Sequence, residues 1–275
     1  MKRLTFFILC LELIFSKVAL AELRQEKDLP GKETALSSDE KLWKFSSSVT
    51  YETGDFGADT TTNTVYIPFT IKRYFKEGDL SFTIPYIYQE SGPEVSSLDG
   101  KPFQIHSSPA GSKRISEGIG DMSLKGSYYL LDESDKPLNL SAVGKIKLPT
   151  ADEDKGLGTG KADETLGLEA SKTIDEWILS ADIYYTFIGD PEGADLNNEF
   201  AFDFGGEYHI IEPTTVGLFY EESTALLDDA SNPRDLLFTV GHKLDENVQL
   251  FGDVSVGLSN GSSAVGVTAG GSLYF

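Results

Sequence analysis

The chain ends in a segment in which two kinds of side chain alternate and whose last residue is aromatic. From residue 265 to residue 275 the odd positions are Val, Val, Ala, Gly, Leu and Phe, and the even positions are Gly, Thr, Gly, Ser and Tyr. A period of two is typical of a β-strand whose two faces lie in different environments. The segment therefore predicts a strand with one apolar face.

The beginning of the chain predicts export from the cytoplasm. A basic start, Met1 to Arg3, precedes a mostly apolar run from Leu4 to Phe15, and residues 18–21 offer a small-x-small cleavage site. This pattern indicates a secretory signal peptide over residues 1–21. The apolar run is shorter than the ~20 residues that a membrane-spanning helix needs. Cys10, the one cysteine, lies inside it, so we expect no disulfide or thiolate chemistry after cleavage.

Residues 22–43 are charged and show no periodicity, and we expect them to form a flexible periplasmic segment; a plug inside the lumen is the alternative. Beyond them, alternating segments and turn clusters repeat to the end of the chain and predict about twelve strands. Most have the ~9–11 residues or more that cross a bilayer at a tilt, whereas strands of soluble sandwiches have ~5–6. The expected strands cover 44–53, 62–75, 79–90, 118–131, 138–149, 162–173, 177–188, 198–210, 215–223, 234–244, 248–258 and 264–275.

The connections between these strands differ in length. Alternation alone fits a soluble sandwich with its apolar face inside as well as a barrel with its apolar face on lipid. Every second connection is short, however, and most of the others are longer, the longest being residues 91–117. Short turns at one end and long loops at the other are the outer-membrane pattern. We therefore expect an all-β fold, a transmembrane antiparallel up-and-down β-barrel over residues 44–275, with Phe275 at the periplasmic rim on the lipid face.

Aromatic residues gather near both ends of the expected strands, as in the interfacial girdles of membrane barrels. Ordinary enrichment of aromatic residues in strands is the alternative explanation. The set near the short turns is Trp43, Tyr74, Phe75, Tyr128, Tyr129, Trp177, Tyr208 and Phe275, and the set near the long loops is Tyr86, Tyr88, Phe187, Phe200 and Tyr220.

Three stretches resemble a known family. They are residues 118–131, the run Val143 to Thr150, and the Gly-Leu-Gly-Thr-Gly of residues 156–160. They are similar to outer-membrane proteins named for the meta-pathway of phenol degradation, over most of residues 60–275. The resemblance implies an outer-membrane barrel that passes small, often apolar or aromatic, compounds.

The last strand is also similar to the closing strand of outer-membrane barrels. That resemblance implies that Leu273, Tyr274 and Phe275 form the signal that the insertion machinery reads. The implied partners are the barrel-assembly machinery, outer-membrane lipid with lipopolysaccharide, and a small-molecule solute.

The polar faces of the strands carry charges that we expect to line the lumen. Three lysines fall on two neighbouring expected strands, and most of the acids fall on the strands that follow. A basic wall facing an acidic wall would create a transverse field that selects solutes. Alternatively, these charges pair across strands and fill the barrel. The candidates are Asp121, Lys125, Lys145, Lys147, Glu169, Asp182, Asp203 and Glu207.

Two prolines interrupt neighbouring expected strands. A turn between Lys76 and Glu77 would place Pro68 and Pro85 opposite each other on the polar face. Proline cannot donate to a strand ladder. The pair therefore indicates a break or bulge, and hence either a kinked wall with a lateral gap or a distortion without a role in transport.

Composition and motifs narrow the function. A net charge of −21 excludes nucleic-acid binding through backbone phosphates. His106, His209 and His242 lie in different parts of the chain, and no catalytic or metal-binding motif accompanies them, so we expect no enzyme activity, cofactor or metal. The sequence favours a passive channel for a small solute. Two alternatives stay open: a non-transporting barrel that uses its loops, and a barrel enzyme that acts on lipid.

Overall fold

The computed structural model describes residues 42–275, except 57–59, 93–94, 99, 105–112 and 192. The predicted signal peptide and nearly all of the expected flexible segment lie outside the described residues. The described chain forms β-strands and one short 3-10 turn, η1 (Glu153–Lys155). In this part of the chain no helix is both long enough and apolar enough to cross a membrane.

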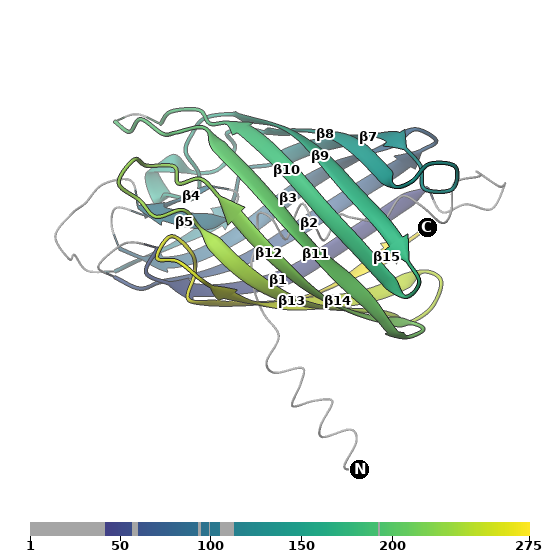
Figure 1. The fold of residues 1–275 in the computed structure, drawn as a ribbon. Helices are drawn as coiled ribbons and strands as arrows, with labels where there is room; N and C mark the ends of the chain where they lie inside the picture. Colours follow the sequence, from purple (N-terminus) through teal and green to yellow (C-terminus); the bar gives the residue numbers. More distant parts are fainter. Residues whose placement is uncertain (1–41, 57–59, 93–94, 99, 105–112, 192) are drawn as a thin grey trace, which may run out of the picture.

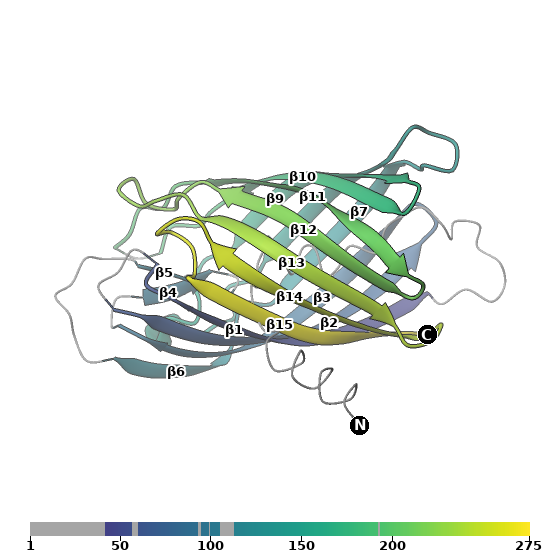
Figure 2. The same ribbon diagram turned by 60° about the horizontal axis from the view of Figure 1, so that its bottom comes forward.

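The strands close into a twelve-stranded antiparallel barrel, in which β6 and β7 follow each other along β3 and count as one strand of the wall (Figures 1 and 2). The last strand pairs with both its predecessor and the first strand, as expected from the sequence. The strands are β1 (Trp43–Gly54), β2 (Thr62–Phe75), β3 (Gly78–Ser91), β4 (Val95–Leu98), β5 (Lys101–Gln104), β6 (Arg114–Ile119), β7 (Ser123–Leu131), β8 (Asn139–Lys147), β9 (Asp163–Ile174), β10 (Trp177–Phe187), β11 (Glu199–Ile211), β12 (Thr214–Ser223), β13 (Arg234–Lys243), β14 (Val248–Gly257) and β15 (Val265–Tyr274).

The two faces of the wall have opposite chemistry. Polar side chains such as Thr50 and Thr268 are buried inside and bond to each other, whereas Phe204 and Ile183 are exposed outside. This arrangement pairs most of the strand backbone within the sheet and presents apolar side chains to lipid, as an outer-membrane barrel requires. The girdle expectation was wrong for Tyr74 and Tyr129: the strand alternation turns both inward.

Both described ends of the chain lie at the end of the short turns, which is the periplasmic end (Figure 1). Trp43 and Phe275 exchange two backbone hydrogen bonds of 2.9 Å there. Phe275 is exposed on the outside of the wall, as predicted. Its role in the insertion signal, with Leu273 and Tyr274, stays a prediction.

The expected strand 118–131 is two strands, β6 and β7, and this expectation was wrong. Both pair with β3: β7 up to Thr83↔Ser123, and β6 from Tyr86↔Ile119 onward. Residues 84–85 of β3 therefore face residues 120–122, so the β6–β7 side carries one extra residue. Such a mismatch is a bulge that bends the strand and interrupts its ladder.

The prolines explain where the ladders break. Pro68 and Pro85 are opposite each other, as predicted, yet β2 and β3 pair without interruption. The Pro85 carbonyl accepts from Gly120 N at 2.9 Å, so its nitrogen, which has no hydrogen, also faces β6 and β7. Pro68 correspondingly faces β1, where register pairs are missing between Ser47↔Phe69 and Thr50↔Tyr66. Each proline thus interrupts the ladder on the side away from the other proline. Pro68 breaks the ladder toward β1, and Pro85 breaks the ladder toward β6 and β7.

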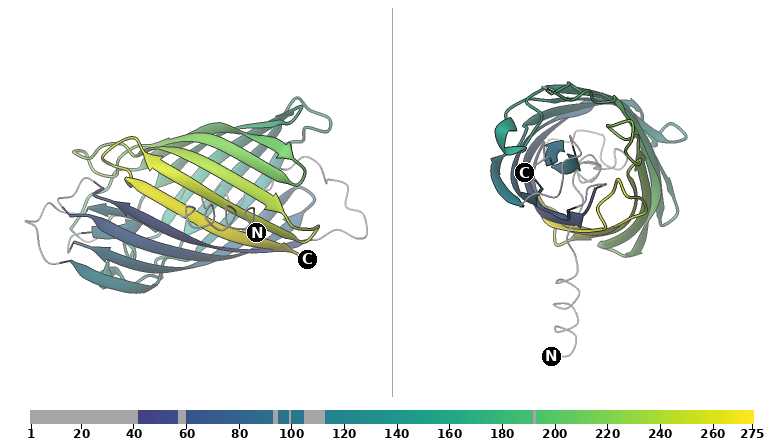
Figure 3. Two further views of the ribbon diagram at one scale, coloured as in Figure 1. Left: turned by 90° about the horizontal axis from the view of Figure 1, so that it is seen from below. Right: turned by 90° about the vertical axis from the view of Figure 1, so that its left-hand side faces the viewer.

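The long connection 91–117 contains a hairpin that the sequence did not predict. Strands β4 and β5 pair with each other alone and lie inside the ring of strands at the loop end (Figure 3). All four residues of β4 are buried. Leu98 packs with Ile188 and Leu196 of the neighbouring loops, so the hairpin narrows the extracellular mouth of the barrel.

Candidate functional site

The barrel wall has a seam on one side of β6. β7 and β8 pair up to Ser123↔Lys147, where β8 ends. Beyond that point, β3 is the strand partner of β6 in the described chain. On its other side β6 lies against the connection 148–162: Arg114 donates to Asp154 O at 3.4 Å, and Gly118 lies beside Leu157. Ile115 and Ile119 are exposed on this strand. We call the line between β6 and residues 148–157 the seam.

Asp121 and Thr150 connect the two sides of the seam at its end nearest β7 and β8. Asp121 Oδ1 accepts from the backbone nitrogens of Thr150 and Ala151, both at 2.9 Å. Thr150 Oγ1 accepts from Met122 N at 2.9 Å and donates to Gly120 O at 3.2 Å. Leu148 N donates to Met122 O at 2.8 Å. Side chains here replace part of the regular ladder.

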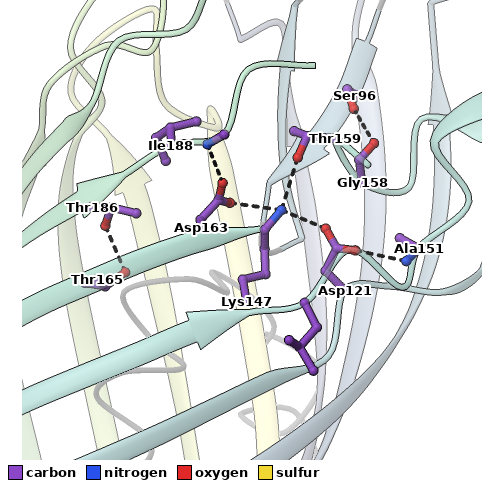
Figure 4. A network of polar contacts seen from close by, with 12 residues as sticks. Ser96, Asp121, Lys147, Ala151, Gly158, Thr159, Asp163, Thr165, Thr186 and Ile188 are labelled. Carbon is purple, nitrogen blue, oxygen red and sulfur yellow. Dashed lines mark hydrogen bonds and ion pairs between the residues drawn. The ribbon is translucent and has the colours of Figure 1, made fainter. Parts of the chain in front are cut away.

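Lys147 lies next to these hydrogen bonds, on the interior face of the wall (Figure 4). Its Nζ is 2.8 Å from Asp121 Oδ2 and 2.9 Å from Asp163 Oδ2, and it donates to Thr159 Oγ1 at 3.1 Å. The lysine and aspartate side chains are 1–4% exposed. Asp163 also accepts from Gly189 N at 2.9 Å. One ammonium group therefore joins the end of β8, the start of β9 and the bulge at Asp121.

A second interior ion pair joins the basic and acidic parts of the wall. Lys125 Nζ on β7 lies 3.1 Å from Glu169 Oε1 on β9. The Tyr184 hydroxyl on β10 donates to the same oxygen at 2.9 Å. These contacts follow the wall across four strands. They agree with the alternative in which interior charges pair across strands.

Charges of one sign also occupy directly opposite positions on neighbouring strands. Lys44 is opposite Lys72, and Lys125 is opposite Lys145, with Ser81 between these two pairs. Like charges that are directly opposite destabilise a sheet. The interior nevertheless carries two such rows, a row of lysines and a row of carboxylates, on different parts of the wall. The acidic row crosses five strands through Glu169, Asp182, Asp203, Glu221 and Asp235.

An apolar cluster lies on the interior side of the seam. Tyr66 of β2, Ile87 of β3 and Leu157 of the connection 148–162 are each about 1% exposed and pack together. Gly100, at the hairpin turn, has φ +81° and lies against the Tyr66 ring, where a Cβ would clash. A side chain at this position would therefore displace the hairpin from Tyr66. The interior beside the seam is thus apolar at this cluster, while the charged network of Lys147, Asp121 and Asp163 lies at the end of the seam nearest β7.

All eight predicted lumen residues face the interior, but they do not form one site. Asp121 and Lys147 meet in one network, Lys125 and Glu169 meet in another, and Glu207 lies opposite Gly217, away from both. The remaining three are Lys145, Asp182 and Asp203, and all three are buried on the interior face.

Sequence reasoning missed Asp163, Thr159, Tyr184 and Leu157. Asp163 and Tyr184 lie on the polar faces of strands that were expected, so alternation could have indicated them. Thr159 and Leu157 belong to a connection whose path follows from no local pattern.

Comparisons with known proteins agree with this architecture. The crystal structure of the COG4313 outer membrane channel from Pseudomonas putida F1 superposes with a TM-score of 0.69 at 14% identity, covering 90% of this chain and 100% of that chain. The NanC porin has a TM-score of 0.53 at 9% identity, covering 84% and 100%. The transport unit of the autotransporter AIDA-I from Escherichia coli has a TM-score of 0.50 at 11% identity, covering 88% and 93%.

A search of curated protein sequences finds no match. A family model described as "Putative MetA-pathway of phenol degradation" matches residues 44–275, which is the whole barrel. The resemblance seen in the sequence is therefore confirmed. The twelve-stranded fold and its neighbours place the protein in the outer membrane, with the architecture of a channel or transporter barrel. The chain belongs to the family of outer-membrane barrels named for the MetA pathway of phenol degradation.

Proposed function

We propose that the protein is a passive channel for a small apolar or aromatic solute, which enters the barrel at the seam. The observation that carries this proposal is the edge of β6 that has no strand partner among the described residues, beside the interior cluster of Tyr66, Ile87 and Leu157. At this point the wall is closed by side-chain contacts instead of a full ladder. A solute that crosses here passes from one apolar environment into another and loses little solvation free energy.

The charged rows favour aromatic solutes with a polar substituent. The lysine row presents cations to the face of a ring, and the carboxylate row presents acceptors to a hydroxyl group. Lys44 and Lys72 already lie 5.4 and 5.7 Å from the ring centroids of Tyr274 and Tyr74. A phenolic ring would make the same kind of contact as it moves through the interior.

Two cysteines across the seam test the route. Met122 N and Thr150 Oγ1 are 2.9 Å apart, so we substitute both residues with cysteine. Cys10 lies in the predicted signal peptide, and the two new cysteines would therefore be the only ones in the processed protein. We expect cross-linking to abolish uptake of labelled phenol by cells that depend on this barrel, and reduction to restore it. Ion conductance in planar bilayers serves as the control and should change little. Unchanged phenol uptake after complete cross-linking would rule out entry at the seam.

A non-transporting barrel is the second candidate, and a specific observation favours it. The ion pairs Lys125–Glu169 and Lys147–Asp121 lie inside the wall and fill interior volume. Liposome swelling separates the two candidates. Swelling with an aromatic alcohol or a pentose supports the channel, and a barrel that is impermeable to both supports the second candidate.

We propose that the barrel has no catalytic role. His209 lies on the interior face of β11, whereas His242 lies on the outer face of β13 and bonds to Thr214 at 2.8 Å. His106 lies outside the described residues. Two histidines on opposite faces of a wall cannot serve one reaction centre. Phospholipid hydrolysis that is lost on substitution of either histidine would contradict this proposal.

A further inference from the structure

Arg73 is a cation on the lipid-facing side of the barrel near the periplasmic end. It lies on β2, two residues before the strand ends. Trp43 of β1 and Leu80 of β3 are directly opposite it on its two sides. Ile71 and Phe75, its neighbours on the same face of β2, are exposed. The arginine is therefore surrounded by apolar side chains that face the membrane.

Two aromatic rings hold the guanidinium group. Its Cζ lies 4.8 Å from the centroid of the Trp43 ring and 5.5 Å from that of Phe75. Stacking on ring faces leaves the edge of the planar guanidinium, with its N–H donors, available to an acceptor. Within the described part of the chain, Arg73 has no carboxylate at ion-pair distance. The adjacent Lys72 differs, because it points inward to Asp79, at 3.6 Å.

The position of Arg73 limits the acceptor to one class of molecule. A cation at the edge of the hydrocarbon region reaches toward the headgroups. Lipid phosphates are the anions at that depth, and a guanidinium binds phosphate through two parallel hydrogen bonds. Trp43, which stacks on Arg73, also pairs with Phe275 at the point where β15 closes the barrel.

We propose that Arg73, held between Trp43 and Phe75, binds the headgroup phosphate of an anionic phospholipid in the periplasmic leaflet of the outer membrane. The lipid would cover the outside of β1 and β2 next to the closing strand. Its acyl chains would lie along the exposed face that includes Phe45 and Ile71. This site is distinct from the interior and from the seam.

Native mass spectrometry of the intact barrel, titrated with phosphatidylglycerol, tests the site. We expect Arg73→Gln to weaken binding of the first lipid by about tenfold or more, as the loss of a charge-assisted hydrogen-bond pair implies. Arg73→Lys keeps the charge without the fork and should lie between wild type and Arg73→Gln. Lys172→Gln is the matched control: Lys172 has the same charge, end and face, but already lies 2.9 Å from Glu133.

Three results would overturn the proposal. The first is equal lipid binding by wild type and Arg73→Gln. The second is an equal loss in Lys172→Gln, because that would reflect general surface charge. The third is displacement of the lipid by millimolar inorganic phosphate, because the site would then recognise a free anion. Heat-dependent mobility on gels verifies that each variant is folded, and Phe75→Leu, which removes one ring, should also weaken binding.

Discussion

Replacing Lys147 with methionine should destabilise the barrel severely. Methionine keeps the length of the side chain but removes the ammonium group from two carboxylates that lie 2.8 and 2.9 Å away. Asp121 and Asp163 are then left buried near each other without their shared counter-charge. They keep their backbone donors, Thr150 N, Ala151 N and Gly189 N, so only part of their stabilisation is lost.

The size of the effect follows from burial. Removing one partner of a buried ion pair costs about 3–5 kcal/mol, because a desolvated charge stays uncompensated. This corresponds to a change of about two to four orders of magnitude in the unfolding equilibrium constant. Lys172→Met is the matched control: its pair with Glu133 has the same 2.9 Å distance, but the lysine side chain is 42% exposed. Pairs of that kind contribute about 0–1 kcal/mol.

Reversible urea unfolding in lipid vesicles measures both variants. Trp43 and Trp177, the two tryptophans of the chain, report the transition by fluorescence. The triple variant Lys147→Met, Asp121→Asn, Asp163→Asn should recover part of the lost stability, because no buried charge remains. If Lys147→Met unfolds within about 1 kcal/mol of wild type, as the Lys172 control should, the network does not hold the wall together and the reasoning fails.

Further predictions concern selectivity, acid stability and packing. Lys145→Glu should shift ion selectivity toward cations in planar bilayers, and unchanged selectivity in a conducting barrel would exclude this lysine from the pathway. Glu133, in a periplasmic turn, is partly buried, which alone would raise its pKa, but Lys172 and Thr173 N outweigh burial and lower the pKa below its ordinary 4.5. Its stabilisation is therefore present above pH 4.5 and is lost as the pH falls through the lowered value; Glu133→Gln should remove this acid-dependent loss in unfolding titrations. Gly205→Ala should cost about 1–3 kcal/mol in urea unfolding, because the new Cβ would clash with the adjoining strand, whereas Gly144→Ala, whose Cβ meets no atom within 4 Å, should be neutral.

Much of the wall could be predicted from the sequence because the pattern that predicts a strand is local. Side chains alternate with a period of two wherever one face of a strand meets lipid, so the strands after residue 138 match their predicted ranges within one or two residues. The interior orientation of Lys125 or Asp203 follows from the same alternation. Contacts between these residues do not, because they depend on register between strands. Lys147 meets Asp163 through the pairing of β8 with β9, and no sequence spacing encodes that distance.

The sequence by itself determined that this chain forms a barrel of alternating strands, with its apolar face outward and a terminal aromatic residue at the periplasmic rim. Only the tertiary structure decided where that wall is incomplete. The two prolines were visible, but the side on which each one breaks a ladder depends on which way its carbonyl points after pairing. The seam beside β6, the hairpin inside the mouth and the Trp43 ring beside Arg73 all arise from contacts between strands. Such contacts form only when the sheet closes, so they belong to the fold as a whole.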